Sequence, residues 1–371
     1  METISTTNES IAECLPTEDY DLLRFSLVIY VGTPISLLGV FFNVILIKLF
    51  FSPQKISSPS LYLLILAILD LLICLMYIPF FTVDALAIYF KCSILHDIYQ
   101  KYVMFLYGAS KQTQFASTYV ILFGTMERFV MIANIQSCSY LIKRRGRFQV
   151  ISIVIIASFF LRLPSYFEYT VEYIEGCLPF ENYGYHPLLA ALDFYPTFSF
   201  YVFNILHVMV PFILLLTLNI MIVTFTKKKI SKVPWRHKDF TQLPKIAALL
   251  RKECTSPSDK KQRDEIRYQT RTIIFIVSTY LMCNLPSVFI TVLEKLFPKS
   301  PLIINEDETS SRFYTLCTDA ISILVCVNSV LRIFIYYAGN PALRNQIKSL
   351  IFIRNKNIVD LKTYNGEITD L

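Results

Sequence analysis

Charged residues are scarce in this sequence. Asp, Glu, Lys and Arg make up 17% of the 371 residues and 54% are hydrophobic, whereas roughly 25% of a typical soluble domain is charged. The hydrophobic residues form long blocks, which excludes an ordinary soluble fold. The nine Cys form no C-x-x-C pair and the four His no H-x-x-H pair. The sequence therefore predicts no metal site and no cofactor.

Seven hydrophobic blocks are long enough to cross a bilayer as helices, which takes about 20 residues each. They are Ser26–Phe51, Leu61–Val83, Tyr102–Ile132, Phe148–Tyr166, Phe198–Phe225, Thr272–Leu293 and Phe313–Tyr337. The sequence therefore predicts an all-α integral membrane protein with a seven-transmembrane helix bundle. The net charge of +7 lies in the connections between the blocks, where basic residues are membrane-topology signals, so we exclude nucleic-acid binding.

Basic residues gather on one side of the predicted bundle. Lys and Arg are concentrated in the connections 51–59, 135–149 and 226–268 and in the tail after Ala338. The positive-inside rule places these segments in the cytoplasm and the N-terminus outside. We expect an extracellular tail over 1–24, with no signal-peptide pattern, and the membrane domain over 25–338. The loop 226–268 should be mobile, and 339–371 should hold an inner-leaflet amphipathic helix (Pro341–Arg354) and a cytoplasmic tail. Asn8-Glu9-Ser10 is a glycosylation sequon.

Short motifs in every span but the fourth point to one family. They are Gly39 and Asn43, Ala67–Asp70, Thr125–Phe129, Pro211 with Leu218–Asn219, Cys283–Pro286, and Asn328–Ser329 with Tyr336. With these motifs in this order, the chain resembles a rhodopsin-like (class A) G-protein-coupled receptor. The segment Leu163–Tyr169 and the Cys-Asn-Leu-Pro of the sixth span are similar to the invertebrate FMRFamide-type neuropeptide receptors. This resemblance implies a multi-pass plasma-membrane receptor that binds an extracellular peptide, acts through a heterotrimeric G protein and is no enzyme.

Four ionisable side chains inside the apolar spans need an explanation. They are Asp70, Lys111, Arg128 and Arg332. A charge in hydrocarbon costs at least about 2.5 to 3.5 kcal/mol on insertion scales, so each should be paired, hydrated or functional. The resemblance assigns Glu127, Arg128 and Tyr336 to the family's G-protein switch. The alternative is that Arg128 only extends its charge to the cytoplasmic surface.

The resemblance also implies an internal polar network. Asp70, Ser117, Asn328 and Ser329 occupy places that surround a sodium ion in the family, and Asn43 adds a polar group from the first span. The remaining place, usually Asn, is Arg332. We expect Asp70 and Arg332 to form an ion pair and no sodium to bind there. The alternative is that Arg332 turns to the cytoplasm and stays hydrated.

The family's usual disulfide is altered in this sequence. The Cys expected at the outer end of the third span is Val103. The resemblance makes Cys177 the second-loop partner, and Cys92 is the nearest substitute for the missing Cys. We expect a Cys92–Cys177 bond, while a free Cys92 or a Cys92–Cys14 bond stays open, because connectivity does not follow from sequence. The family's Trp residues in the fourth and sixth spans are also absent.

Acidic residues outnumber basic ones in the outer connections, which would concentrate a cationic ligand. Positive-inside sorting alone could produce the same excess. The resemblance favours an amidated, FMRFamide-like peptide with a cationic Arg. We expect Glu168 and Glu172 to bind this Arg by charge-assisted hydrogen bonds. Further lining residues predicted from their polarity and depth are Lys111, Gln114, Asn284 and Asp319.

Other functions remain open from the sequence. A chemosensory receptor for a small molecule has the same architecture, and a transporter could use Asp70 and Arg332 as a coupling pair. The C-terminal Thr369-Asp370-Leu371 matches the ending that PDZ domains bind, although a disordered end explains it as well. No nucleophile with a base and an orienting group can be placed, which argues against an enzyme.

Overall fold

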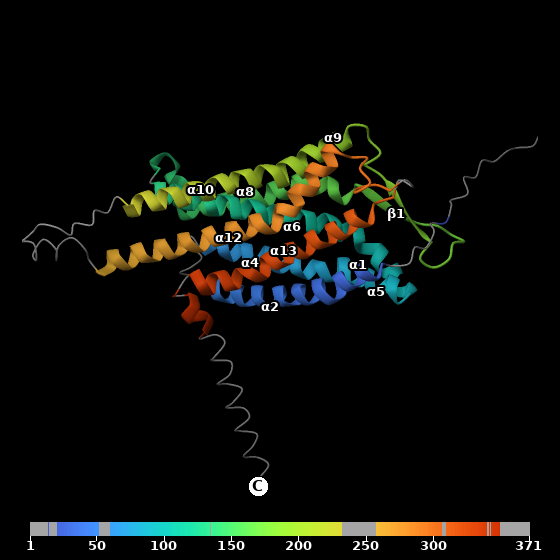
Figure 1. Cartoon of the computed structure of the whole chain (residues 1–371), viewed down its shortest axis with the longest axis horizontal. Helices are drawn as coiled ribbons and strands as arrows, with labels where there is room; N and C mark the ends of the chain where they lie inside the picture. Colours follow the sequence, from blue (N-terminus) through green and yellow to red (C-terminus); the bar gives the residue numbers. More distant parts are fainter. Residues whose placement is uncertain are drawn as a thin grey trace, which may run out of the picture.

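The computed structural model of this chain describes residues 14, 21–51, 60–133, 135–231, 257–305, 309–339, 341 and 343–348. Within these residues, seven helices are long and apolar enough to cross a membrane. They lie side by side in one elongated bundle (Figure 1). The predicted seven-transmembrane fold is therefore confirmed.

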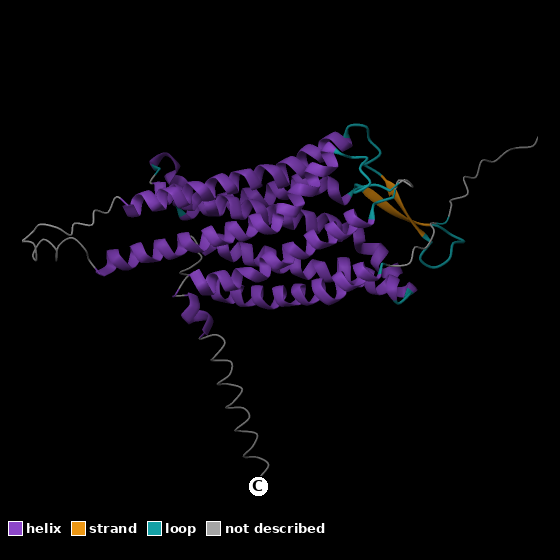
Figure 2. Ribbon diagram, viewed as in Figure 1, coloured by secondary structure: helices purple, strands orange, loops and turns teal. Residues whose placement is uncertain are grey.

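Helices make up nearly all of the described bundle (Figure 2), and most of the seven spanning helices join several shorter elements end to end. The first two are α1 (Leu22–Ser26), η1 (Leu27–Gly32) and α2 (Thr33–Phe50), then α4 (Ser60–Tyr77), η2 (Ile78–Thr82) and α5 (Val83–Tyr89). The third is α6 (Ser93–Ala133). Two short helices, η3 (Gln136–Cys138) and α7 (Ser139–Ile142), then lead to the fourth, which consists of α8 (Arg144–Arg162) and η4 (Leu163–Tyr166). The last three are α9 (Tyr195–Ser199), η5 (Phe200–Met209) and α10 (Val210–Ser231), then α12 (Pro257–Leu296), then α13 (Arg312–Gly339).

Proline residues accompany the irregular segments. The segments η1, η2 and η5 are π-helical, with Pro34 just after the first, Pro79 inside the second and Pro211 just after the third. Proline has no backbone N–H and its ring crowds the preceding turn, so the regular i to i−4 pattern cannot continue there. All three π-helical segments thus contain a proline or end two residues before one.

The helices contact one another in chain order around a ring. α2 contacts α4, α4 contacts α6, α6 contacts both α8 and α10, α10 contacts α12, and α13 closes the ring between α12 and α2. The largest apolar cluster joins five of these helices through Leu66, Val120, Val154, Leu215 and Val277. The ring leaves α6 largely enclosed, which explains how this long helix holds so many polar residues.

Close approach of helices requires glycine at one position of α6. A Cβ built on Gly108 would lie 2.5 Å from the ring of Tyr166 in η4. The Tyr166 hydroxyl donates to Gln112 Oε1 at 2.7 Å. Gly108 therefore lets the end of the fourth spanning helix pack directly on α6.

One end of the bundle carries an antiparallel hairpin of β1 (Tyr169–Tyr173) and β2 (Tyr183–Pro187). We call it the hairpin end, and it lies opposite the end where α10 and α12 extend (Figure 1). A disulfide joins Cys177 to Cys14, and Cys92 is exposed and free. The expected Cys92–Cys177 bond is therefore wrong. Cys92 lies in the short connection between α5 and α6, and the partner of Cys177 comes from the N-terminal segment instead.

Two ion pairs fasten the N-terminal segment to α13. Arg312 binds Asp21 through two hydrogen bonds of 2.6 and 3.0 Å. These bonds hold the pKa of the Asp21 carboxyl below its usual range. One turn further along, Arg24 Nε lies 2.8 Å from Asp319 Oδ2. Together with the disulfide, these contacts bind the N-terminal segment to the hairpin end.

The opposite end differs from the sequence prediction in its boundaries. The loop expected over 226–268 is shorter, because α10 continues to Ser231 and α12 begins at Pro257. In the predicted amphipathic helix, residues 343–348 are helical, and Leu343 and Ile347 are buried in a cluster with Leu46 and Tyr336. The described part of this helix therefore packs on the bundle through the apolar face that was expected to meet lipid.

Candidate ligand and signalling sites

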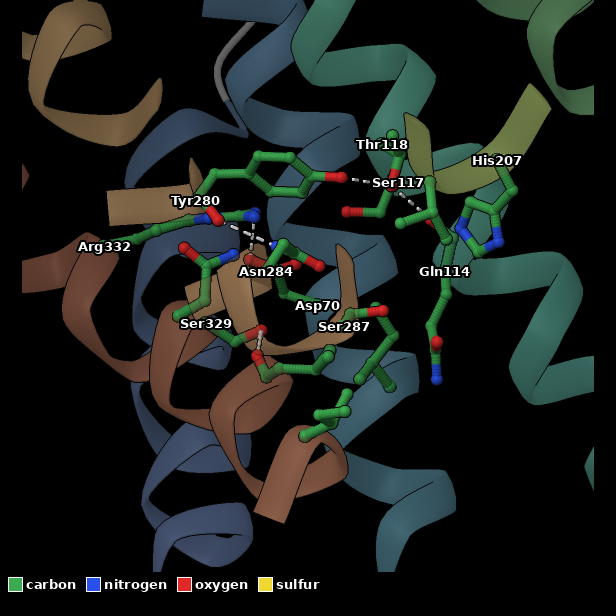
Figure 3. A pocket seen from close by; sticks show the side chains of 15 residues that line it. Asp70, Gln114, Ser117, Thr118, His207, Tyr280, Asn284, Ser287, Ser329 and Arg332 are labelled. Carbon is green, nitrogen blue, oxygen red and sulfur yellow. Dashed lines mark hydrogen bonds and ion pairs between the residues drawn. The ribbon is translucent and has the colours of Figure 1, made fainter. Parts of the chain in front are cut away.

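A cavity of about 70 Å³ lies in the middle of the bundle, and Figure 3 shows its polar lining. The polar side chains around it are Asp70, Gln114, Ser117, Thr118, His207, Tyr280, Asn284, Ser287, Asn328, Ser329 and Arg332. A cavity volume of about 10 to 15 Å³ is enough to hold one water molecule. The space therefore suits a few waters and is far too small for a peptide.

Arg332 and Asp70 form an ion pair in this cavity wall, as the sequence predicted. Both side chains are at most 2% exposed. Ser117 and Ser329 line the same cavity as Asp70. Among the described residues, Asp70 Oδ1 and Arg332 Nε have no hydrogen-bond partner. The guanidinium thus occupies the centre of the network and does not turn to the surface.

The remaining members of the predicted polar network differ in whether they line the cavity. Ser117, Asn328 and Ser329 line the same cavity. Asn43 is fully buried but donates from Nδ2 to the Gly39 carbonyl of its own helix at 2.8 Å, and it does not line the cavity. A contact that the sequence did not reveal joins Thr118 to the hydroxyl of Tyr280 at 3.1 Å. This bond links α6 to α12 across the cavity.

Glu127 has an unexpected partner at the end where α10 and α12 extend. Arg147 of α8 donates from Nε to Glu127 Oε1 at 2.7 Å, and both side chains are buried. Arg128 is also buried and interacts electrostatically with Glu127. Tyr336 is 1% exposed and packs edge-on against Phe50. Glu127 is therefore shared between the two arginines, one on its own helix and one on α8.

The two glutamates predicted to bind a cation lie in different surroundings. Glu172 is exposed on β1, with His186 3.7 Å away across the hairpin. Glu168 is half-buried, and its Oε2 has no hydrogen-bond partner among the described residues. Burial raises the pKa of the Glu168 carboxyl, while Lys111, Tyr107 and Arg162 act in the opposite direction. Of the two glutamates, only Glu168 therefore has a carboxylate oxygen buried against the bundle.

The other predicted lining residues divide between two depths. Gln114 and Asn284 line the central cavity, where Asn284 donates to the Tyr280 carbonyl at 2.8 Å. Asp319 lies closer to the hairpin end and already has Arg24 as a partner. Lys111 lies over the ring of Tyr107, 5.5 Å from its centroid. The structure thus does not bring all six predicted residues together in one pocket.

Sequence reasoning missed Arg162, a buried charge in the fourth spanning helix. It is 2% exposed and donates from Nη2 to Nδ1 of His207. Its guanidinium carbon also lies 4.3 Å from the ring centroid of Phe203. The rule that flags ionisable residues in apolar spans applies to Arg162 as well. Its position inside the predicted span Phe148–Tyr166 was the available signal.

This arrangement defines a helical membrane protein with the buried ion pairs Asp70–Arg332 and Glu127–Arg147 inside a seven-helix bundle. Residues 42–336, well over half of the chain, match the family described as 7 transmembrane receptor (rhodopsin family). The chain belongs to this family of receptors and is a multi-pass plasma-membrane protein. It is also similar to the FMRFamide peptide receptor frpr-18 of Caenorhabditis elegans. The two are 23% identical over 336 residues, which cover 90% of this chain and 70% of the relative. These matches agree with the predicted receptor class and the absence of an enzymatic role.

Proposed function

We propose that this receptor is activated by a cationic, C-terminally amidated peptide of the FMRFamide type and signals through a heterotrimeric G protein. The observation that carries the proposal is the similarity to an FMRFamide peptide receptor over nearly the whole chain. The acidic side chains at the hairpin end support it, because they raise the local concentration of cations. The central cavity is too small for a peptide, so the ligand binds nearer the hairpin.

The proposal places the hairpin end and the N-terminus outside the cell. The connections at the other end carry most of the Lys and Arg residues, which favours a cytoplasmic location. The disulfide between Cys14 and Cys177 agrees with an oxidising exterior. The sequon at Asn8 and the C-terminal Leu371 lie outside the described residues. Neither the family match nor the relative supports PDZ binding.

Glu168 is the proposed partner of the peptide's Arg. Its Oε2 is buried and lacks a hydrogen bond within the described part of the chain, so a donor from the ligand would satisfy it. A charge-assisted hydrogen bond to this group contributes about 1.5 to 3 kcal/mol. Glu172 is proposed as a second, more exposed contact on the hairpin, where solvent weakens the interaction.

Arg128 is the proposed switch toward the G protein. It is buried beside Glu127, whose carboxylate Arg147 also holds. Activation would move Arg128 out of this cluster and toward the cytoplasmic surface, with Tyr336 moving from its contact with Phe50. The arrangement in the structure is therefore proposed to be the resting one.

The test is a screen of amidated peptides on cells that express this chain, with G-protein activation as the readout. We expect peptides ending in Arg-Phe-amide to activate the receptor. Glu168→Gln should lower their potency about 10- to 100-fold. Glu175→Gln, an exposed change in the same outer connection, is the matched control and should have no effect. Activation by small molecules with no response to any amidated peptide would overturn the proposal.

A further inference from the structure

Lys111 of α6 and Arg162 of α8 place two cations inside the bundle near the hairpin end. Their charges interact with each other and both interact with Glu168. The guanidinium of Arg162 lies over two rings, 4.3 Å from the centroid of Phe203 and 5.4 Å from that of Phe115. Aromatic faces stabilise a cation while leaving its N–H edge available. The two side chains are thus held in place without being neutralised.

The partner of Arg162 is a histidine that adds no negative charge. Arg162 can only donate, so Nδ1 of His207 accepts and the proton of the ring is on Nε2. This histidine is therefore neutral. Within the described residues, Nε of Arg162 has no hydrogen-bond partner. A buried guanidinium with an unused donor is incomplete without an acceptor.

Lys111 is also without a strong partner. It forms no hydrogen bond or ion pair with any residue that the structure describes, and its closest aromatic contact is the Tyr107 ring at 5.5 Å. The acids that act on it are Glu168 and Glu294. Glu294 already accepts from the Tyr314 hydroxyl at 2.6 Å. Among the described residues, Lys111 therefore has no carboxylate in direct contact, and one of the two acids that act on it is already engaged by another residue.

We propose that Lys111 and Arg162 form an anion subsite that binds a carboxylate of the ligand. As a refinement of the proposed function, the peptide then carries an acidic group besides its Arg. Its Arg would bind the unpartnered oxygen of Glu168 while its carboxylate binds Lys111 and the free Nε of Arg162. Arg162 Nε and Glu168 Oε2 would each gain the partner that it lacks among the described residues. The carboxylate comes from an Asp or Glu side chain of the peptide or from a free C-terminus.

The subsite lies next to the central cavity. His207, the partner of Arg162, lines that cavity together with Gln114, one turn along α6 from Lys111. Figure 3 shows these two residues on the side of the cavity opposite Arg332. A carboxylate that binds Nε and Nη2 of Arg162 together would displace His207 from Nη2, and the released imidazole would change the lining of the cavity. Binding at the subsite would therefore reach the polar network between α6 and α12.

A peptide-independent measurement tests whether the subsite exists. Purified receptor is heated with N-acetyl-glutamate amide or with the neutral N-acetyl-glutamine amide at equal ionic strength. We expect only the anion to raise the Tm, because a ligand that binds the folded state stabilises it. Lys111→Gln should abolish the shift, and Arg162→Lys should retain more of it than Arg162→Gln. Lys101→Gln, an exposed change on the same helix, should leave it intact. Equal shifts with both compounds in the unmutated receptor overturn the subsite.

Peptide pairs then identify the source of the carboxylate. Amidated peptides ending in Arg-Phe-amide carry either Glu or Gln at one upstream position, and the Gln peptides are also made as free acids. We expect the Glu peptide to be about 10- to 100-fold more potent than its Gln partner, and Lys111→Gln to remove the difference. Higher potency of the free-acid peptide alone would show that the carboxylate in the subsite comes from the C-terminus of the peptide. Equal potency throughout means that peptides do not use the subsite, whereas no activation by any peptide refutes the proposed function and leaves the Tm result standing.

Discussion

Breaking the Asp70–Arg332 pair from one side should destabilise this receptor strongly. Both side chains are at most 2% exposed, so water screens neither charge. Asp70→Asn keeps the size of the side chain and removes only the negative charge, which leaves Arg332 buried without its counterion. Such a change typically costs about 3 to 5 kcal/mol. That cost lowers the ratio of folded to unfolded receptor by a factor on the order of 10² to 10⁴.

The double variant separates the pair from general damage at the site. Asp70→Asn combined with Arg332→Asn removes both charges, so part of the lost Tm and surface expression should return. Asp193→Asn, at an exposed position in the outer connection, serves as the control. If the single variants are as stable as the unmutated receptor, or if the double variant is no better than the worse single one, the reasoning is wrong. Because Arg332 supplies the positive charge at this place, ligand affinity should also be independent of sodium, which binding at varied sodium and constant ionic strength would measure.

Further predictions concern other contacts. Arg147→Gln should lower the Tm, because it removes the hydrogen-bonded ion pair of the buried Glu127 carboxylate and leaves Arg128 as the remaining cation, at a cost of up to about 3 to 5 kcal/mol, and an unchanged Tm would contradict this role. Cys14→Ser should cost about 2 to 5 kcal/mol while Cys92→Ser is neutral, and the reverse order in thermal unfolding would refute the assigned disulfide. Gly108→Ala should cost about 1 to 3 kcal/mol through overpacking against the facing tyrosine ring, as a reduced Tm would show.

The sequence predicted the spanning helices well because length and hydropathy alone decide which segments can cross a bilayer. The resemblance to the receptor family also predicted the Asp70–Arg332 pair, because Arg332 takes a place in the family's sodium site that is usually Asn, and the structure forms this pair. The ends of the helices were less accurate: α6 begins at Ser93, whereas Tyr102 was expected. The segment from Ser93 to Lys101 includes charged and polar residues, so the hydropathy rule leaves it out of the predicted span. An enclosed helix near the membrane surface nevertheless tolerates such residues.

Pairings that depend on three-dimensional approach could not be predicted. The sequence favoured Cys92 as the partner of Cys177, whereas the structure joins Cys177 to Cys14, which lies 163 residues away in the sequence. Glu127 was expected to interact with its neighbour Arg128, whereas the position of α8 against α6 gives it Arg147 as well. Asp319 was predicted as a ligand contact, and nothing in the local sequence indicates that Arg24 lies beside it.

The covalent link between Cys14 and Cys177 changes which parts of the receptor must move together. In the usual family arrangement this loop is tied to the third spanning helix, so a displaced hairpin pulls on that helix. Here the hairpin is tied to the N-terminal segment, which Asp21 and Arg24 fasten to α13. A force on the hairpin is therefore transmitted to the first and seventh helices. Because α13 also carries Arg332 and Tyr336, a ligand that contacts the hairpin, as proposed above, would act on the far end of the bundle through this helix.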